Sequence, residues 1–164
     1  PKILDVEIDS GTPWARKHIE TIRQAYARAP FLDRYLPALE ELLQRRWERL
    51  VDLDIACAAL MARWLGLHRR IERASALGIT GERSIRLVNI CQYFGASIYV
   101  SGDAAETYLD VPLFESQGIA VEWQRYSHPR YRQLYGTFIS DLSALDLLFN
   151  YGDESQSIAF EGNR

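Results

Sequence analysis

The sequence contains few cysteines, no large excess of one charge and no long apolar run. Of its 164 residues two are cysteine and three are histidine, and the formal net charge is −3. So few cysteines and histidines argue against a zinc site or a disulfide framework. The weak negative charge argues against binding nucleic acid through a basic surface. No apolar stretch reaches the roughly 18–20 residues that a membrane-spanning helix needs.

Recognisable catalytic signatures are also missing. The sequence has no P-loop, no complete dinucleotide-binding fingerprint, no serine nucleophile elbow and no zinc-ligand spacing. It therefore identifies no cofactor, and we expect no metal. Cys57 and Cys91 lie on predicted apolar helical faces, so we interpret them as reduced core thiols, with a disulfide between them as the alternative. We expect a cytoplasmic protein that lacks a signal peptide and a transmembrane segment and binds a small molecule.

Apolar residues at three- and four-residue spacing predict three amphipathic helices in the first part of the chain. The predicted ranges are 14–29, 33–45 and 50–65. Pro30 ends the first of them and Gly66 ends the third. Arg16 and Lys17, near the start of the first helix, belong either to a solvated face or to an anion contact.

The second part of the chain alternates short apolar segments with helical patterns. Strands are predicted at 70–74, 97–101 and 119–126, and helices at 84–94, 104–109, 113–117 and 142–149. This order favours a parallel sheet with right-handed crossovers, in which we expect Cys91 and Phe94 to be buried against Ile98 or Val100. The predicted fold class is α/β, with a parallel sheet, flanking helices and an α-rich amino-terminal half. The parts are a helical part at 10–66, an α/β part at 67–152 and a tail at 153–164 that shows no pattern.

Three predicted strand ends fall on one edge of this sheet and carry polar residues. In an open α/β sheet, ligands bind beyond the carboxyl ends of the strands, where helix N-termini offer free N–H groups. Asp103 is a candidate N-cap of the helix that follows the second strand. We therefore predict a cleft at this edge. The predicted substrate-binding residues are Ser75, Ser101, Gly102, Asp103, Tyr131 and Gln133.

His128 is the candidate catalytic residue of this cleft. Imidazole titrates near neutral pH and can act as an acid, a base or a ligand. The alternative interpretation is a partly buried imidazole that fixes the turn before Pro129. Tyr131 and Gln133 alternate after it, as in a cleft wall or an edge strand.

Several segments occur in this chain in an order typical of one known family. They are residues 14–26, 29–37, 95–102, 108–110, 128–136 and 142–152, together with Phe114, Gly118 and Ile119. Through these segments, which cover nearly the whole chain, the chain resembles the carboxyl-terminal two-thirds of a protein of the WbqC-like protein family. The resemblance implies a single WbqC-like domain at 1–164. Tyr135 stands where the family usually has histidine, which puts a catalytic role at that position in doubt.

The opening that is usual in the family is not found in this sequence. That opening is a strand leading into a His-Gln-Pro turn, followed by a helix and an acidic strand end. Residues 2–9 alternate apolar and charged side chains, which predicts a half-exposed strand that needs partners. We therefore expect a further segment before Pro1 in the natural protein.

The resemblance implies a role in the biosynthesis of bacterial O-antigen and related surface polysaccharides. It suggests an enzyme that modifies an activated sugar, such as a nucleotide-linked sugar, for example by nucleotide-assisted amide or acyl transfer. A glycosyltransferase is the alternative enzyme. From a different class, the alternative is a non-catalytic binding or scaffold protein of a polysaccharide assembly complex.

Overall fold

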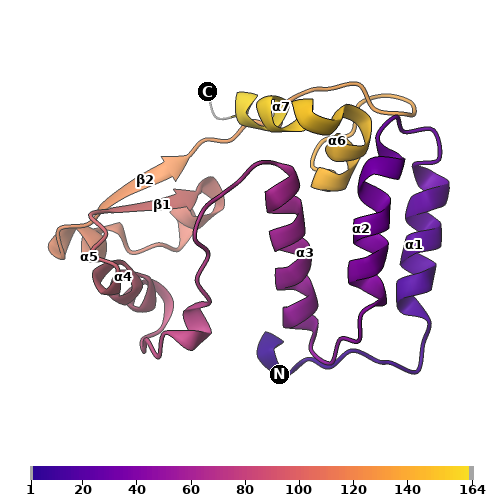
Figure 1. The fold of residues 1–164 in the computed structure, drawn as a ribbon. Coiled ribbons are helices and arrows are strands. Elements are labelled where there is room, and N and C mark those ends of the chain that lie inside the picture. The colour runs from indigo at the N-terminus through magenta and orange to yellow at the C-terminus, as the bar shows by residue number, and fades with distance from the viewer. Residues whose placement is uncertain (1, 163–164) are drawn as a thin grey trace. The chain divides into compact units, whose positions relative to one another are not determined.

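Helices predominate in the structure, a computed structural model that describes residues 2–162 and has a mixed α/β fold (Figure 1). The chain divides into two compact units. The first, called here the helical unit, comprises residues 2–68 and 128–161. The second, the sheet unit, comprises residues 69–127 and Gly162. The sheet unit is thus inserted into the sequence of the helical unit.

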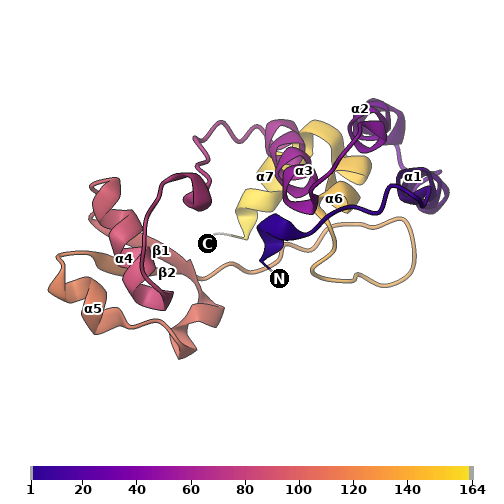
Figure 2. The ribbon, with the colours of Figure 1, turned by 90° about the horizontal axis from the view of Figure 1, so that it is seen from below.

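The helical unit is built on three helices that lie side by side: α1 (Trp14–Ala25), α2 (Leu32–Gln44) and α3 (Leu50–Trp64). Figure 2 shows them nearly end-on. All three were predicted, although α1 ends earlier than expected and a turn precedes Pro30. Two later helices, α6 (Ala144–Tyr151) and α7 (Ser155–Glu161), lie across one end of the three (Figure 1). The prediction assigned residues 128–152 to the α/β part, whereas here they pack with the helices.

Two clusters of buried side chains hold the helical unit together. The first contains Ile19, Leu39, Leu42, Leu43, Leu53 and Leu60. The second contains Ala29, Leu32, Tyr35, Leu36, Leu148 and Phe149. Helix α2 contributes to both clusters, which explains why so many of its leucines are buried. Because Leu148 and Phe149 are fully buried, α6 completes the core that the three earlier helices begin.

The sheet unit contains two parallel strands, β1 (Ile98–Gly102) and β2 (Ala120–Gln124). Helices α4 (Arg83–Tyr93) and α5 (Val111–Ser116) and the 3-10 helix η3 (Asp103–Thr107) accompany them. The parallel pairing confirms the predicted sheet. Its inner face packs on a cluster made by Val88, Cys91, Ala105, Leu109, Phe114 and Ile119.

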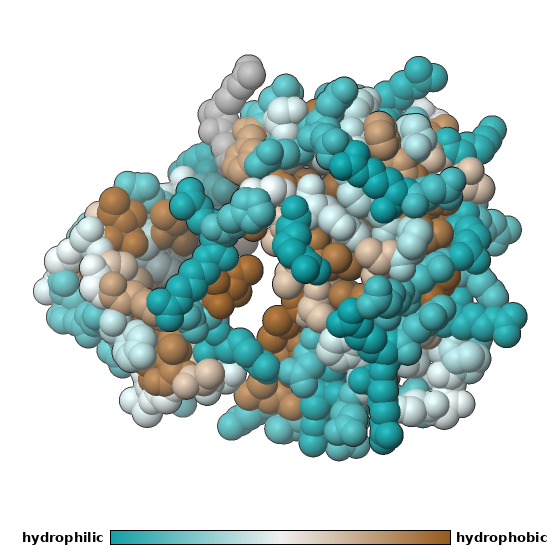
Figure 3. All heavy atoms as spheres, viewed as in Figure 1, coloured by the Kyte–Doolittle hydropathy of each residue, from teal (hydrophilic) through white to brown (hydrophobic). Residues whose placement is uncertain are grey.

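The prediction for the inner face of β1 was wrong. Tyr99 packs against the core, and its ring stacks on Phe114 with centroids 4.9 Å apart. Ile98 and Val100 lie on the opposite face and are 48% and 58% exposed, and Phe94 is also exposed. Cys91 is buried as expected. Figure 3 shows apolar residues in brown among the teal hydrophilic ones on the visible surface.

Three other segments differ from the prediction. Residues 70–74 form no strand, and Ile71 is 71% exposed, because the segment is rich in arginine and has no neighbouring strand to pair with. Residues 2–9 form a 3-10 helix at Ile3–Asp5 and a single antiparallel bridge from Glu7 to Arg49 instead of a strand. The tail, which showed no pattern, contains α7. Within residues 2–162, no helix is both long and apolar enough to cross a membrane.

Candidate functional site

The predicted site residues are divided between the two units. Ser75, Ser101, Gly102 and Asp103 lie in the sheet unit, whereas His128, Tyr131 and Gln133 lie in the helical unit. Each group is therefore described within its own unit.

At the end of β1, the turn differs from the predicted capped helix. Gly102 occupies the cap position with a φ of −73°, and Asp103 is already the first residue of η3 and caps nothing. The carboxylate of Asp103 lies 3.9 Å from the guanidinium of Arg125, which also binds Glu106 at 2.7 Å. Two acidic groups around one arginine are an unfavourable place for an anionic ligand. Ser101, just before them, is half-buried.

Ser75 lies in a short 3-10 turn, Ala74–Ala76, and is exposed. Because the predicted strand before it does not form, no strand end carries Ser75 to the edge of the sheet. Asp110, in the same unit, has a capping role: its carboxylate accepts a hydrogen bond from the backbone N–H of Leu113 at 3.2 Å and so begins α5.

In the helical unit, aromatic rings gather around His128. Strand β2 ends at Gln124, so His128 lies in the irregular segment that follows it and not at a strand end. The centroid of its ring is 6.2 Å from that of Tyr131 and 5.9 Å from that of Phe138. Tyr131 also meets Tyr151 edge-on, with centroids 5.8 Å apart. Nδ1 of His128 is 3.1 Å from the carbonyl oxygen of Pro129, which favours the tautomer with its proton on Nδ1.

A cleft of about 630 Å³ lies beside this cluster and is called here the arginine cleft. It is lined by Arg130, Tyr131, Arg132, Gln133, Leu134, Gly136, Phe138 and Tyr151. The guanidinium of Arg130 lies over the ring of Phe138, 5.0 Å from its centroid. In the part of the chain that the structure describes, neither Arg130 nor Arg132 forms an ion pair with a carboxylate.

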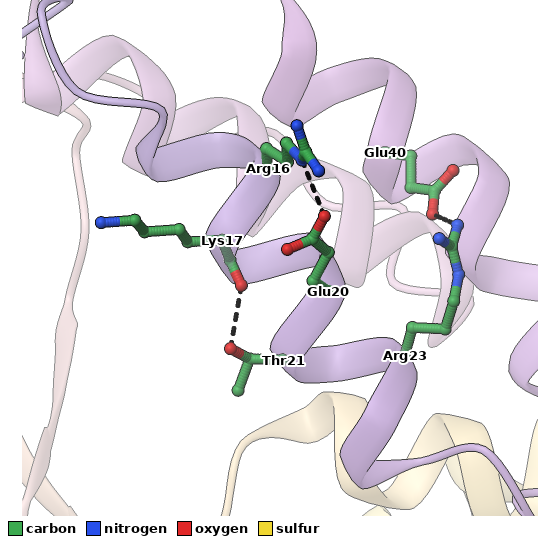
Figure 4. Close-up of polar contacts among 6 residues, drawn as sticks. All are labelled: Arg16, Lys17, Glu20, Thr21, Arg23 and Glu40. Atoms are coloured by element: carbon green, nitrogen blue, oxygen red, sulfur yellow. Dashed lines mark hydrogen bonds and ion pairs between the residues drawn. The ribbon is translucent and has the colours of Figure 1, made fainter.

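Arginines of α1, by contrast, already have acidic partners (Figure 4). Nε of Arg16 binds Glu20 at 2.7 Å, one turn further along the helix, and Arg23 binds Glu40 of α2. The side chain of Lys17 extends away from the other labelled residues in Figure 4. This pattern is typical of a solvated helix face, the first of the two interpretations given above.

Gln133 holds a loop in place. Its amide nitrogen donates to the carbonyl oxygen of Ile139 at 2.8 Å, and its amide oxygen accepts from the N–H of Ile139 at 2.9 Å. This paired contact fixes the residues between them, of which Leu134, Gly136 and Phe138 line the arginine cleft. We infer that Gln133 shapes the wall of the cleft through this loop.

A buried carboxylate that the sequence reasoning missed lies next to the cleft. Asp146, in the first turn of α6, is only 4% exposed. Its Oδ1 accepts a hydrogen bond from the hydroxyl of Tyr26 at 3.0 Å, and its Oδ2 accepts one from the hydroxyl of Tyr131 at 2.9 Å. Burial and the negative charge of Asp146 raise the pKa of Tyr26, which keeps that hydroxyl protonated as a donor. The only sequence signal was an acid inside an apolar helix.

Asp146 also lines a pocket of about 320 Å³, called here the Asp146 pocket. The other lining residues are Ala25, Tyr26, Gln133, Leu134, Tyr135, Ile139 and Leu142. Gln133 and Leu134 line the arginine cleft as well, so the two cavities are neighbours.

The WbqC-like protein family matches residues 1–158. The chain belongs to the WbqC-like family. A protein of Mycobacterium tuberculosis named "Uncharacterized protein Rv1507c" is 33% identical to this chain over 156 residues. These residues cover 94% of this chain and 67% of the relative. No solved structure matches the chain. The arginine cleft and the Asp146 pocket both lie within the range that the family matches.

Proposed function

We propose that this WbqC-like protein is an enzyme of bacterial surface-polysaccharide biosynthesis that modifies an activated sugar by nucleotide-assisted amide or acyl transfer. The family resemblance supports a role in surface-polysaccharide biosynthesis. The arginine cleft supports a phosphate-bearing sugar as the ligand. A nucleotide-linked sugar carries phosphates, a sugar ring and a base, and each of these needs a different kind of partner.

The arrangement of Arg130 and Arg132 carries the proposal. A guanidinium that has no acidic partner is available for phosphate, which it binds through paired hydrogen bonds. Aromatic rings in the same cleft, from Tyr131, Phe138 and Tyr151, offer flat apolar surfaces to a sugar or a base. A volume of about 630 Å³ lies within the usual range of about 300–1,000 Å³ for small-molecule sites.

His128 is the proposed acid–base group beside this cleft. In the proposed reaction, a hydroxyl or amino group of the sugar attacks the acyl carbon of an activated donor. The bond from that carbon to the leaving group breaks, and the leaving group departs with the electron pair. The proton of the attacking group passes to the imidazole of His128 and from there to the leaving group. The proposal does not depend on Ser75, Ser101, Gly102 and Asp103, which stay predictions for the sheet unit.

Calorimetric titration with ATP, UDP-glucose and UDP-N-acetylglucosamine tests the proposal. We expect at least one of these to bind the wild-type protein, and Arg130→Ala and Arg132→Ala to weaken that binding tenfold or more. Arg46→Ala is the matched control, because Arg46 is an exposed arginine of the same unit that pairs with Glu48. Equal weakening in the control, or no binding of any of the three, contradicts the proposal and favours a scaffold protein.

A second measurement distinguishes the proposed amide- or acyl-transferring enzyme from the alternative, a glycosyltransferase. After incubation of the bound nucleotide sugar with cellular acyl donors, mass spectrometry is expected to show a modified sugar still attached to its nucleotide. A glycosyltransferase would instead release the free nucleotide. His128→Asn is expected to abolish turnover while leaving the melting temperature nearly unchanged.

A further inference from the structure

Asp146 is an unusual residue for the interior of a protein. A buried aspartate normally has a cationic partner, since an unpaired buried charge is costly. Among the described residues, Asp146 receives hydrogen bonds from two tyrosine hydroxyls, and no lysine, arginine or histidine forms an ion pair with it. The N-terminal turn of α6 offsets part of the charge through the helix dipole. A carboxylate has about four acceptor positions, so two remain for further donors.

The residues that line the Asp146 pocket indicate which kind of ligand group could donate hydrogen bonds to the carboxylate. Apart from Asp146 and Gln133, the walls are made of apolar and aromatic side chains, including the rings of Tyr26 and Tyr135. A hard metal ion would need several oxygen ligands. Within residues 2–162 no group of three or more metal-ligating side chains exists, so a metal ion does not fit. An ammonium group attached to a carbon skeleton fits both the carboxylate and the aromatic walls.

We propose that the Asp146 pocket binds the protonated primary amino group of an amino sugar. The inference rests on the proposed function for the sugar itself, and it adds that the sugar carries a free amine. Because Gln133 and Leu134 line both cavities, one ligand can place its phosphates in the arginine cleft and its amino group in the pocket.

An NMR titration with three monosaccharides tests this site directly. Glucosamine has the free amine, N-acetylglucosamine has it blocked, and glucose lacks it. We expect glucosamine alone to shift the signals of Tyr135, Leu142 and Asp146 in a saturable manner. Asp146→Asn keeps the shape of the side chain and removes its charge, so it is expected to weaken glucosamine binding tenfold or more. Asp33→Asn, at an exposed acid of α2, is the control and is expected to bind glucosamine normally.

A second variant covers the case in which Asp146→Asn does not fold. Ile139 lines the pocket but is 58% exposed, so its replacement removes little buried surface. Ile139→Lys adds an ammonium group to the pocket wall that competes for the carboxylate. We expect it to fold, to keep its melting temperature and to lose glucosamine binding.

Two outcomes overturn the inference: equal binding of glucosamine and N-acetylglucosamine, or unchanged glucosamine binding in Ile139→Lys. A parallel titration with UDP-glucose, which has phosphates but no amine, measures binding in the arginine cleft separately. If UDP-glucose binds and glucosamine does not, the amine site is wrong and the proposed function stands. If glucosamine binds and no nucleotide sugar does, the amine site stands and the proposed function is wrong.

Discussion

Phe149 offers a direct measure of how strongly the returning segment stabilises the helical unit. Its side chain is fully buried among residues of α2, including Leu32, Tyr35 and Leu36. Its ring also meets that of Tyr26 edge-on, with centroids 5.0 Å apart. Removal of a buried phenylalanine side chain costs about 3–5 kcal/mol, and loss of an aromatic pair adds about 1 kcal/mol. We therefore expect Phe149→Ala to lower the free energy of unfolding by about 4–6 kcal/mol.

Native-state amide hydrogen exchange measures this change at the helix that Phe149 covers. The opening free energy of the core amides of α2 is expected to fall by the stated amount, although α2 lies more than a hundred residues earlier in the chain. Phe160→Ala is the control, because Phe160 is 49% exposed, and it is expected to cost about 1 kcal/mol or less. A loss below about 1 kcal/mol for Phe149→Ala, or one confined to α6, would refute the idea that α6 completes the core.

Three further predictions concern stability. Tyr35→Phe removes a buried hydroxyl that has no hydrogen-bond partner among residues 2–162, so thermal unfolding is expected to show a gain of about 1 kcal/mol, and a loss would reveal a partner. Burial raises the pKa of Tyr26 above its ordinary value of 10.0, so this hydroxyl stabilises the fold below that pH and its contribution is lost as the pH rises further. Urea unfolding between about pH 8 and 11 is therefore expected to show a steeper alkaline loss for wild type than for Tyr26→Phe, and parallel curves would contradict this. Gly152→Ala would place a Cβ 2.7 Å from the ring of Phe31, whereas Gly136→Ala meets nothing within 4 Å at a similar positive φ. We expect the first to cost at least about 2 kcal/mol more than the second in chemical unfolding, and equal costs would show that the ring moves aside.

Much of the helical structure could be predicted because helix formation leaves a local signal. The spacing of leucines predicted α2 and α3, and Gly66 and Gly95 both adopt the positive φ that ends a helix. The parallel pairing of β1 and β2 followed from the helices between them. These features depend on residues that lie close together in the sequence.

The face of β1 could not be predicted, because neighbouring residues on both faces are apolar. Ile98, Tyr99 and Val100 follow one another, so alternation does not tell which side is buried. The aromatic ring of Tyr99 occupies the core, and the smaller Ile98 and Val100 remain at the surface. The packing of Tyr99 against Phe114, which is a tertiary contact, determines which face of β1 is buried.

Residues of the candidate site that are close in sequence also lie in the same unit. His128, Tyr131 and Gln133 belong to the helical unit, and Tyr131 and Gln133 line the arginine cleft, while their role in binding stays a prediction. Asp146 was missed because one of its partners, Tyr26, is 120 residues away. An acid in a helix normally indicates a solvent-facing position, and only the fold reveals the two hydroxyls that face it.

Because the sheet unit is inserted into the helical unit, the two parts of the helical unit are synthesised at different times. A ribosome adds about 5–20 residues per second, so α1, α2 and α3 emerge several seconds before α6. During that interval the surface of α2 that later covers Leu148 and Phe149 is bare, while residues 69–127 emerge from the ribosome. The nascent helices are therefore a natural client for a chaperone until the last quarter of the chain arrives.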